Sequence, residues 1–204
     1  MNYISQAGQE KWVIDFFKQK RGGYFVDIGA YDGKEISNTY LLEKEFGWDG
    51  VCIEPSIKMF KKLRENRRCV LLNRAAHSEN CIVYFDDIGV SSLISPVGKH
   101  KVRASTMEVI LKEVSAPKII DYLSLDTEGS EYDILRGFPF DKYEIILLTV
   151  EHNICYGDTQ HVSLKKNIYK ILTKNGYVRV REDVLCNGDP KYPFEDWYVN
   201  KKYL

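Results

Sequence analysis

Segments with the apolar pattern of β-strands alternate with segments of helical periodicity along most of the chain. We predict strands over residues 23–29, 50–55, 69–76, 81–87, 118–126, 143–153, 177–183 and 196–200. We predict helices over residues 37–47, 56–67, 106–114, 130–138 and 163–176. A strand, a helix and a further strand in succession place the two strands in parallel. The pattern therefore predicts an α/β three-layer sandwich, with a mostly parallel sheet and an antiparallel C-terminal edge.

The length of 204 residues favours one domain, because a chain of this size can bury a full core. We expect a single domain over residues 1–204, with a helical lead-in over 1–22 and the α/β core over 23–204. The 29 basic and 29 acidic residues balance each other. A neutral chain offers no electrostatic footprint for nucleic acid, which argues against a nucleic-acid partner.

The sequence lacks the usual marks of a secreted or membrane protein. The N-terminal residues do not have the charged-then-apolar pattern of a signal peptide, and no stretch approaches the ~18 apolar residues of a membrane helix. The five cysteines are scattered, odd in number and never in C-x-x-C spacing, so neither a disulfide framework nor a zinc site is predicted. We expect a cytoplasmic protein with reduced thiols and no membrane span.

Acidic side chains stand at the ends of four predicted strands. Ligands of parallel α/β sheets bind outside the carboxyl ends of the strands. The residues at those ends are Asp27 with Gly29 and Gly33, then Glu54, then Asp126 with Glu128, and finally Glu151 with His152. Like charges raise one another's pKa and cost stability, so a structural role gives little reason to gather carboxylates at one rim. We interpret this rim as the functional site.

The turn after the first strand, with the sequence VDIGAYDG, indicates which ligand the rim takes. Its glycines stand four residues apart and not in the G-x-G-x-x-G order that suits a pyrophosphate. Gly29 permits a positive φ, and Gly33 lets the following backbone approach a ligand. Asp27 and Ala30 crowd the turn, and the Asp27 carboxylate would repel a pyrophosphate. Glu54 can accept hydrogen bonds from both ribose hydroxyls. A ligand with adenine and ribose, no phosphate, and a sulfonium and an ammonium fits best, namely S-adenosylmethionine.

Short motifs follow one another along the first three quarters of the chain. They are D-x-G-A-x-D-G from Asp27, S-N-T from Ser37, G-W-x-G from Gly47, I-E-P from Ile53 and L-D-x-E-G from Leu125. Together they resemble the FkbM family of methyltransferases, within the class I, Rossmann-like fold that uses S-adenosylmethionine. The likeness runs from about Ser5 to Asn153. It implies transfer of a methyl group to a hydroxyl of a saccharide or another small molecule, often a sugar, a glycosylated metabolite or a polyketide.

Several polar residues near the rim admit more than one interpretation. Ser37 and Asn38 either cap the first helix of the core or contact the methionine part of the cofactor. Asn73 either approaches the adenine end of the pocket or caps a loop. Glu131 suits the positive end of the helix that it begins. A helix start does not account for Asp126, which ends an otherwise apolar strand, so we assign Asp126 to the cofactor and catalytic sites.

An alcohol needs a base to accept its proton, or a cation to lower its pKa, before it attacks a methyl group. The candidate catalytic residues are Asp126, Glu128, Glu151 and His152. We favour His152 as the base, with its ring oriented by Glu151 and with Asp126 nearest the transferring methyl group. In the alternative, Asp126 with Glu151 or His152 holds Mg²⁺ or Mn²⁺ on hard oxygen ligands. In a third interpretation, Glu151 and His152 only brace the end of their strand.

Three other functions deserve comparison with a sugar O-methyltransferase. A methyltransferase of RNA ribose or another polymer would share the fold and the cofactor. A nicotinamide dehydrogenase is disfavoured by the spacing of the glycines. A catalytically silent module would keep the fold and bind other proteins. The acidic residues of the rim argue against it, because such a module has no use for catalytic carboxylates. The sequence leaves open the acceptor, the methylated position and the oligomeric state.

Overall fold

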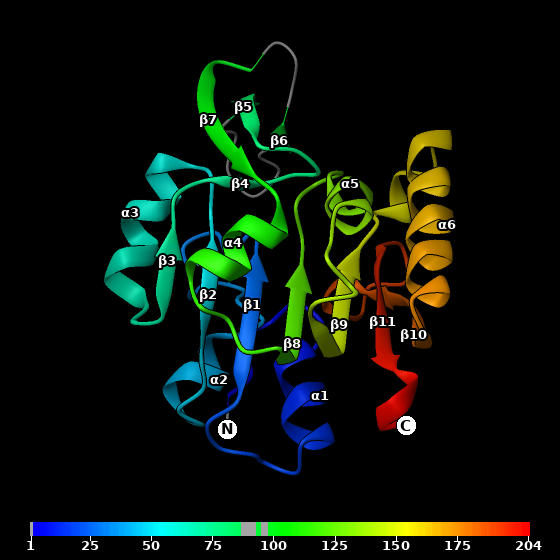
Figure 1. Ribbon diagram of the computed structural model, residues 1–204. Helices are drawn as coiled ribbons and strands as arrows, with labels where there is room; N and C mark the ends of the chain where they lie inside the picture. The colour runs from blue at the N-terminus through cyan, green and yellow to red at the C-terminus, as the bar shows by residue number, and fades with distance from the viewer. Residues whose placement is uncertain (1, 87–92, 95–97) are drawn as a thin grey trace.

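The computed structural model describes residues 2–86, 93–94 and 98–204, and its centre is a seven-stranded sheet (Figure 1). The strands, in their order across the sheet, are β3 (Val70–Leu72), β2 (Asp49–Ile53), β1 (Tyr24–Ile28), β8 (Ile119–Leu125), β9 (Glu144–Glu151), β11 (Pro193–Asn200) and β10 (Tyr177–Leu185). Pairing is parallel from β3 to β9, whereas β11 is antiparallel to both β9 and β10. The predicted sheet is confirmed, with the antiparallel strand one position inside the C-terminal edge.

Helices cover both faces of this sheet and produce the three predicted layers. They are α1 (Gln9–Phe16), α2 (Tyr40–Lys44), α3 (Ile57–Asn66), α4 (Met107–Glu113), α5 (Glu131–Arg136) and α6 (Thr159–Lys174), with the short 3₁₀ helices η2 (Ile154–Tyr156), η3 (Cys186–Gly188) and η4 (Lys201–Tyr203). Residues of α1, α2 and α3 join one buried apolar cluster with Phe25 of β1. Residues of α4, α5 and α6 join a second cluster with the next residue, Val26. Because successive side chains of a strand point to opposite faces, these clusters lie on opposite faces of the sheet.

A second, smaller sheet stands beyond the carboxyl ends of the parallel strands (Figure 1). Its strands, in order, are β4 (Ala75–Ala76), β7 (His100–Ser105), β5 (Cys81–Asp86) and β6 (Leu93–Ile94). The sequence predicts one strand over 69–76, but the structure divides it between the two sheets at Asn73. The Asn73 side chain there donates to the carbonyl oxygens of Glu54 and Pro55. The strand predicted over 81–87 is found as β5, and its last residue, Asp87, lies outside the described residues.

Strand β7 is absent from the sequence prediction, although its buried residues, Val102 and Ala104, alternate with exposed Lys101 and Arg103 as in a half-buried strand. The helix predicted over 37–47 is shorter than expected. Its first residues form a turn in which Ser37 Oγ accepts hydrogen bonds from the backbone N–H groups of Thr39 and Tyr40.

The predicted N-cap of α3 is confirmed, since Ser56 Oγ accepts from Met59 N at 3.1 Å. Helix α1 lies within the lead-in and packs its apolar side on the sheet. Within the described ranges, none of the helices has the length and apolar character needed to cross a bilayer.

Candidate active site

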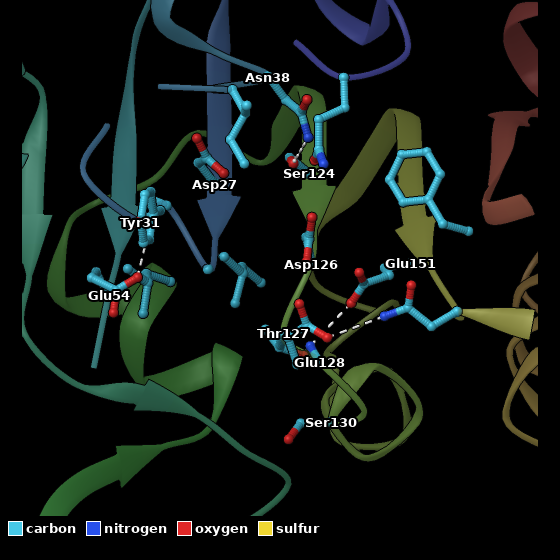
Figure 2. A pocket seen from close by; sticks show the side chains of 18 of the residues that line it. Asp27, Tyr31, Asn38, Glu54, Ser124, Asp126, Thr127, Glu128, Ser130 and Glu151 are labelled. Carbon is cyan, nitrogen blue, oxygen red and sulfur yellow. Dashed lines mark hydrogen bonds between the residues drawn. The ribbon is translucent and has the colours of Figure 1, made fainter. Parts of the chain in front are cut away.

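A cavity of about 290 Å³ opens at the carboxyl ends of the central parallel strands, under the small sheet (Figure 2). The size suits a small ligand of the kind held in protein pockets. One side is formed by β1, β2, the loop between β1 and α2, and parts of β4, β5 and β6. The other side is formed by the ends of β8 and β9, by η2, by the segment from η3 to β11, and by Gln6. The cavity is where the sequence predicts the ligand to bind.

The turn after β1 needs glycine at residue 29. Gly29 has φ 86°, and a Cβ atom at this position would lie 1.7 Å from the carbonyl oxygen of Asp126. Gly33 has a different role, because its missing Cβ would meet Leu63 Cδ1 at 2.3 Å. Gly33 lets the loop pack on α3 and is not among the residues that line the cavity. The residues that follow Gly33, from Glu35 to Asn38, do line the cavity, and the approach of this backbone to a ligand stays a prediction.

Asp27 is buried at the base of the cavity, beside α2 and α3. Its Oδ2 accepts a hydrogen bond of 2.6 Å from Thr39 Oγ1, and Arg67 Nη1 lies 4.0 Å from the same oxygen. Burial raises the pKa of Asp27, while the Arg67 charge and the Thr39 hydroxyl act in the opposite direction. The charge of the Asp27 carboxylate is thus partly balanced by Arg67, which does not line the cavity.

Glu54 stands at the end of β2 and lines the cavity, as predicted. Its two carboxylate oxygens accept hydrogen bonds from backbone N–H groups on both sides. Oε2 accepts from Tyr31 N at 2.9 Å, and Oε1 accepts from Ser56 N at 2.7 Å. Tyr31 has φ 52°, a left-handed conformation that is uncommon for a residue with a side chain. The loop after β1 is therefore bent so that its backbone fixes the Glu54 carboxylate in the wall.

Asp126, Glu128 and Glu151 meet at the ends of β8 and β9 (Figure 2). One carboxylate oxygen of each lies within 4.8 Å of those of the other two. Glu128 has φ 56°, and its backbone N–H donates to Glu151 Oε2 at 3.0 Å. Asn153 Nδ2 donates to Glu128 Oε2 at 3.2 Å. We call Asp126, Glu128 and Glu151 the carboxylate cluster.

The carboxylate cluster titrates far from the ordinary range of acids. Burial, followed by the charges of neighbouring carboxylates, raises the pKa of Glu128 to about 7. Burial also raises the pKa of Asp126 to about 7, although a hydrogen bond with Glu151 acts against the increase. The pKa of Glu151 is raised as well, by burial and then by Asp126. The cluster can therefore exchange a proton near neutral pH.

Glu131 has a larger role than the helix start that the sequence suggests. It is buried, and its Oε1 accepts from Thr127 N, from Thr127 Oγ1 and from Gly129 N at 2.7–3.1 Å. The side chain thus folds the segment between β8 and α5 back on itself and aims Glu128 at the cavity. A carboxylate that caps a loop just ahead of its own helix has no distinctive sequence pattern.

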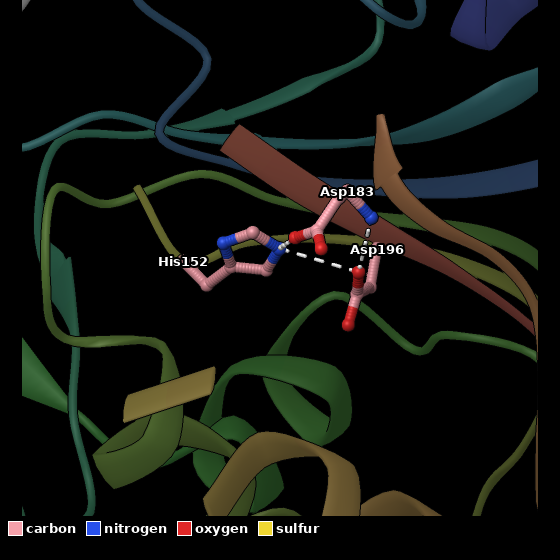
Figure 3. A group of neighbouring side chains, drawn as sticks. All are labelled: His152, Asp183 and Asp196. Carbon is pink, nitrogen blue, oxygen red and sulfur yellow. Dashed lines mark hydrogen bonds and ion pairs between the residues drawn. The ribbon is translucent and has the colours of Figure 1, made fainter. Parts of the chain in front are cut away.

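His152 does not line the cavity, in contrast to the predicted role as base. It lies beside Asp183 and Asp196 instead (Figure 3). Its Nε2 lies 3.2 Å from Asp196 Oδ1 and 3.7 Å from Asp183 Oδ1, and its Nδ1 accepts from Ile154 N at 3.2 Å. Burial alone would raise the pKa of Asp196, but hydrogen bonds, first of all from His152, lower it to about 2. The prediction that Glu151 orients the His152 ring is wrong, because the two side chains leave the strand end on opposite sides.

The remaining predicted residues divide between the cavity and its supports. Ala30, Ser37 and Asn38 line the cavity, and Asn38 Nδ2 donates to Ser124 Oγ at 3.0 Å. Ser37 also shapes the turn before α2, and its contact with the methionine part of the cofactor stays a prediction. Asn73 does not line the cavity and caps the loop after β2.

Several lining residues were not singled out from the sequence. They include Gln6, Tyr31, Glu35, Ile36, Ile53, Phe85, Ile94, Cys155, Tyr156, Cys186, Tyr192 and Phe194. They come from loops and strands far apart in the chain, and their residue types carry no chemical pattern of their own.

The charge of the lining is one-sided. Its described residues include six carboxylates, namely Asp27, Glu35, Glu54, Asp126, Glu128 and Glu151, and no lysine, arginine or histidine. An acidic lining suits a cationic ligand and opposes a phosphate or pyrophosphate.

Sequence comparison matches residues 27–179, three quarters of the chain, to the Methyltransferase FkbM domain. The chain belongs to the FkbM methyltransferase family. A comparison with curated proteins gave no significant match. A class I methyltransferase fold implies that S-adenosylmethionine is bound. The lining fits such a donor, because carboxylates surround a space that must accept a sulfonium and an ammonium group.

Solved structures with the same fold share little sequence with this chain. A methyltransferase FkbM from Methylobacillus flagellatus KT superposes with a TM-score of 0.58 and 15% identity, over 87% of this chain and 43% of the other. A candidate rRNA methylase from Clostridium thermocellum gives 0.55 and 10%, over 98% and 99%. A human methyltransferase 10 domain-containing protein gives 0.52 and 14%, over 95% and 80%. The chain thus spans less than half of the Methylobacillus protein, and these likenesses establish the fold alone.

Proposed function

We propose that this chain is an S-adenosylmethionine-dependent O-methyltransferase whose acceptor is a hydroxyl of an uncharged saccharide or of a small molecule that carries one. The observation that carries the proposal is the one-sided lining, with six carboxylates and no cationic side chain among its described residues. A cationic methyl donor lowers the pKa of carboxyl groups beside it and keeps them charged, so such a wall favours that donor and offers no cationic partner to an anionic acceptor. The saccharide class itself comes from the motifs shared with the FkbM family.

The cofactor belongs on the side of the cavity formed by β1 and β2. Glu54 would accept the ribose hydroxyls, as acidic residues at the end of the second strand do in related folds. Ser37, Asn38 and Asp27 would hold the methionine end, and apolar residues such as Ile53 would face the adenine. When bound, the cofactor supplies a methyl group on a positively charged sulfur, which an acceptor oxygen displaces in line.

The carboxylate cluster is the group placed to activate the acceptor hydroxyl. A base works best when its pKa lies near the operating pH, and burial brings Asp126 and Glu128 to about 7. The hydroxyl proton passes to this cluster as the oxygen attacks, and the neighbouring carboxylates share it. The same three oxygen-bearing side chains could instead hold Mg²⁺ or Mn²⁺, so chelation must be part of the test.

The test is label transfer from labelled S-adenosylmethionine to neutral saccharides, phosphorylated saccharides and small RNAs. We expect transfer only to neutral saccharides, with little dependence on salt. Transfer to RNA that falls steeply with salt would contradict the proposal and point to phosphate contacts. Failure of the protein to bind S-adenosylhomocysteine in a calorimetric titration would contradict it more fundamentally.

The role of the carboxylate cluster is tested with Glu151→Gln and Glu128→Gln, each compared with Asp133→Asn. Asp133 lies on α5 with about half of its side chain exposed, so it is a matched acidic control outside the cavity. We expect a loss of turnover of about 10²–10⁴-fold in the cluster variants, as for removal of a general base. Activity that vanishes on chelation and returns with Mg²⁺ or Mn²⁺ would replace the base by a metal site. His152→Ala should lower stability while methyl transfer by the folded fraction continues.

A further inference from the structure

The proposed cofactor side of the cavity is formed by β1 and β2, and the half beyond β8 and β9 has walls of its own. Three segments that are distant in sequence form it, namely the N-terminal residues around Gln6, the turn from Asn153 to Tyr156, and the segment from Cys186 to Phe194. Hydrogen bonds join the first of these segments to the third. Asn187 N donates to the carbonyl oxygen of Gln6 at 2.8 Å, and Gln6 Nε2 donates to Cys186 Sγ at 3.4 Å. This half is therefore a built subsite.

Glu10 of α1 holds the N-terminal segment around Gln6 through hydrogen bonds. This buried carboxylate accepts hydrogen bonds from Ile4 N at 2.6 Å and from Ser5 N at 2.9 Å. Two backbone groups held by one buried side chain bring the segment to the rim of the cavity, where Gln6 reaches the other walls.

Aromatic side chains dominate the open part of this subsite. Tyr156 is 60% exposed and Tyr192 is 52% exposed, although both line the cavity. The Tyr156 ring contacts the His161 ring at 5.0 Å between centroids, in an edge arrangement. Tyr192 is anchored through its backbone, which accepts from Cys186 N and donates to the carbonyl oxygen of Asp189. The Tyr156 ring and the Tyr192 backbone are thus held in place, while both residues remain more than half exposed, as on a surface that binds a ligand.

The chemistry of these walls selects the kind of molecule that can cover the rings. Tyrosine offers a flat apolar face with a polar tip at low entropic cost, which suits a ligand with both C–H faces and hydroxyls. Phe194, buried beside the carboxylate cluster, extends the apolar surface inward. The lining gives an acidic ligand no cationic partner among its described residues, so a phosphate or carboxylate would find neutral hydrogen-bond donors only.

We propose that Tyr156 and Tyr192 form the acceptor platform of this enzyme, on which the ring of an uncharged pyranoside stacks with one hydroxyl directed at the carboxylate cluster. The assignment rests on the proposed function. Tyr156 and Glu128 line the same cavity, and Asn153, in the turn that carries Tyr156, donates to Glu128 Oε2 at 3.2 Å. Burial, and then the charge of Glu128, raises the pKa of the Tyr156 hydroxyl. A sugar ring on the platform therefore lies within reach of the cluster and of the methyl donor's side of the cavity.

The test uses saturation-transfer NMR on the protein saturated with S-adenosylhomocysteine. The probes are methyl glycosides of glucose, galactose, mannose, rhamnose and fucose, with glucose 6-phosphate and a methyl glucuronide as anionic counterparts. The variants are Tyr156→Ala, Tyr192→Ala, Tyr156→Phe and Tyr192→Phe. The control is Tyr169→Ala, because Tyr169 is a 41% exposed tyrosine of α6 that does not line the cavity. All variants are first titrated with S-adenosylhomocysteine to establish folding and cofactor binding.

We expect at least one neutral glycoside to bind the wild type, with the signal on its ring C–H protons. Each alanine variant should weaken that binding about tenfold, whereas the phenylalanine and Tyr169→Ala variants should stay within about threefold. The proposal is overturned if the alanine variants bind the glycoside as the wild type does, if the anionic sugars bind more tightly, or if no neutral glycoside binds. Loss of S-adenosylhomocysteine binding by the wild type would instead refute the proposed function itself.

Discussion

Arg67, directly after α3, holds the loop that carries the cofactor side of the cavity. Its Nε donates to Glu43 Oε2 at 2.7 Å, and its Nη1 donates to Thr39 Oγ1 at 3.0 Å and to the carbonyl oxygen of Gly33 at 3.3 Å. The guanidinium is fully buried and lies 4.0 Å from Asp27. Burial alone would raise the pKa of Glu43, but Arg67 lowers it to about 2. Two carboxylates and the start of the loop thus depend on one cation.

We expect Arg67→Met to destabilise the protein by about 3–5 kcal/mol at pH 7, because removal of one partner leaves the other charges buried without compensation. Methionine keeps much of the volume, so the loss reports charge and hydrogen bonds. For a chain of this size the corresponding fall in Tm is roughly 6–20 °C. Binding of S-adenosylhomocysteine should weaken too, since Ser37 and Asn38 follow the released segment in the cavity wall.

Urea denaturation followed by circular dichroism measures the change, with Arg64→Met as control. Arg64 is an exposed arginine of α3, one turn earlier, and its loss should cost little. The folded pKa of Glu43 is depressed from 4.5 to about 2, so its contribution is present above pH ~4.5 and is lost as the pH falls toward 2. The difference between Arg67→Met and wild type should shrink accordingly between pH 7 and pH 3. A variant within about 1 kcal/mol of the wild type at pH 7, with an unchanged titration, would refute this account of Arg67.

Three shorter predictions concern the cavity. Gly29→Ala should cost about 2–5 kcal/mol in urea unfolding, because its φ is 86° and the new Cβ would lie 1.7 Å from Asp126 O; Gly188→Ala, with φ 73° and no atom within 4 Å, should cost only about 1–2 kcal/mol, and equal losses would contradict the steric argument. The pKa of Glu128 is raised from 4.5 to about 7, so the folded state loses stability as the pH rises through that range. Glu128→Gln should remove this loss. In urea unfolding, the variant should have a free energy of unfolding at most about 3 kcal/mol above that of the wild type at pH 8, and no gain at pH 4. Glu54→Gln should weaken S-adenosylhomocysteine binding by about 1–3 kcal/mol in calorimetry, and an unchanged isotherm would remove Glu54 from the cofactor site.

The side chains at the ends of strands could be predicted because local order in the sequence decides them. Apolar runs ending in Asp27, Glu54, Asp126 and Glu151 mark four strands, and parallel pairing brings such ends to one edge. The structure places all four in the lining of one cavity. Gly29 could be predicted for the same reason, since its positive φ is a property of a single turn.

Tertiary structure alone decides which face of a strand meets the cavity and which loops close it. Glu151 and His152 are neighbours in sequence, and only the pairing of β11 with β9 shows that His152 forms a hydrogen bond with Asp196. Gly33 faces a helix formed by later residues, so its role depends on a contact across the fold. Tyr156 and Tyr192 come together at the cavity from separate segments. A sequence records periodicity and local turns, whereas contacts between distant segments follow from the burial of apolar surface by the whole chain.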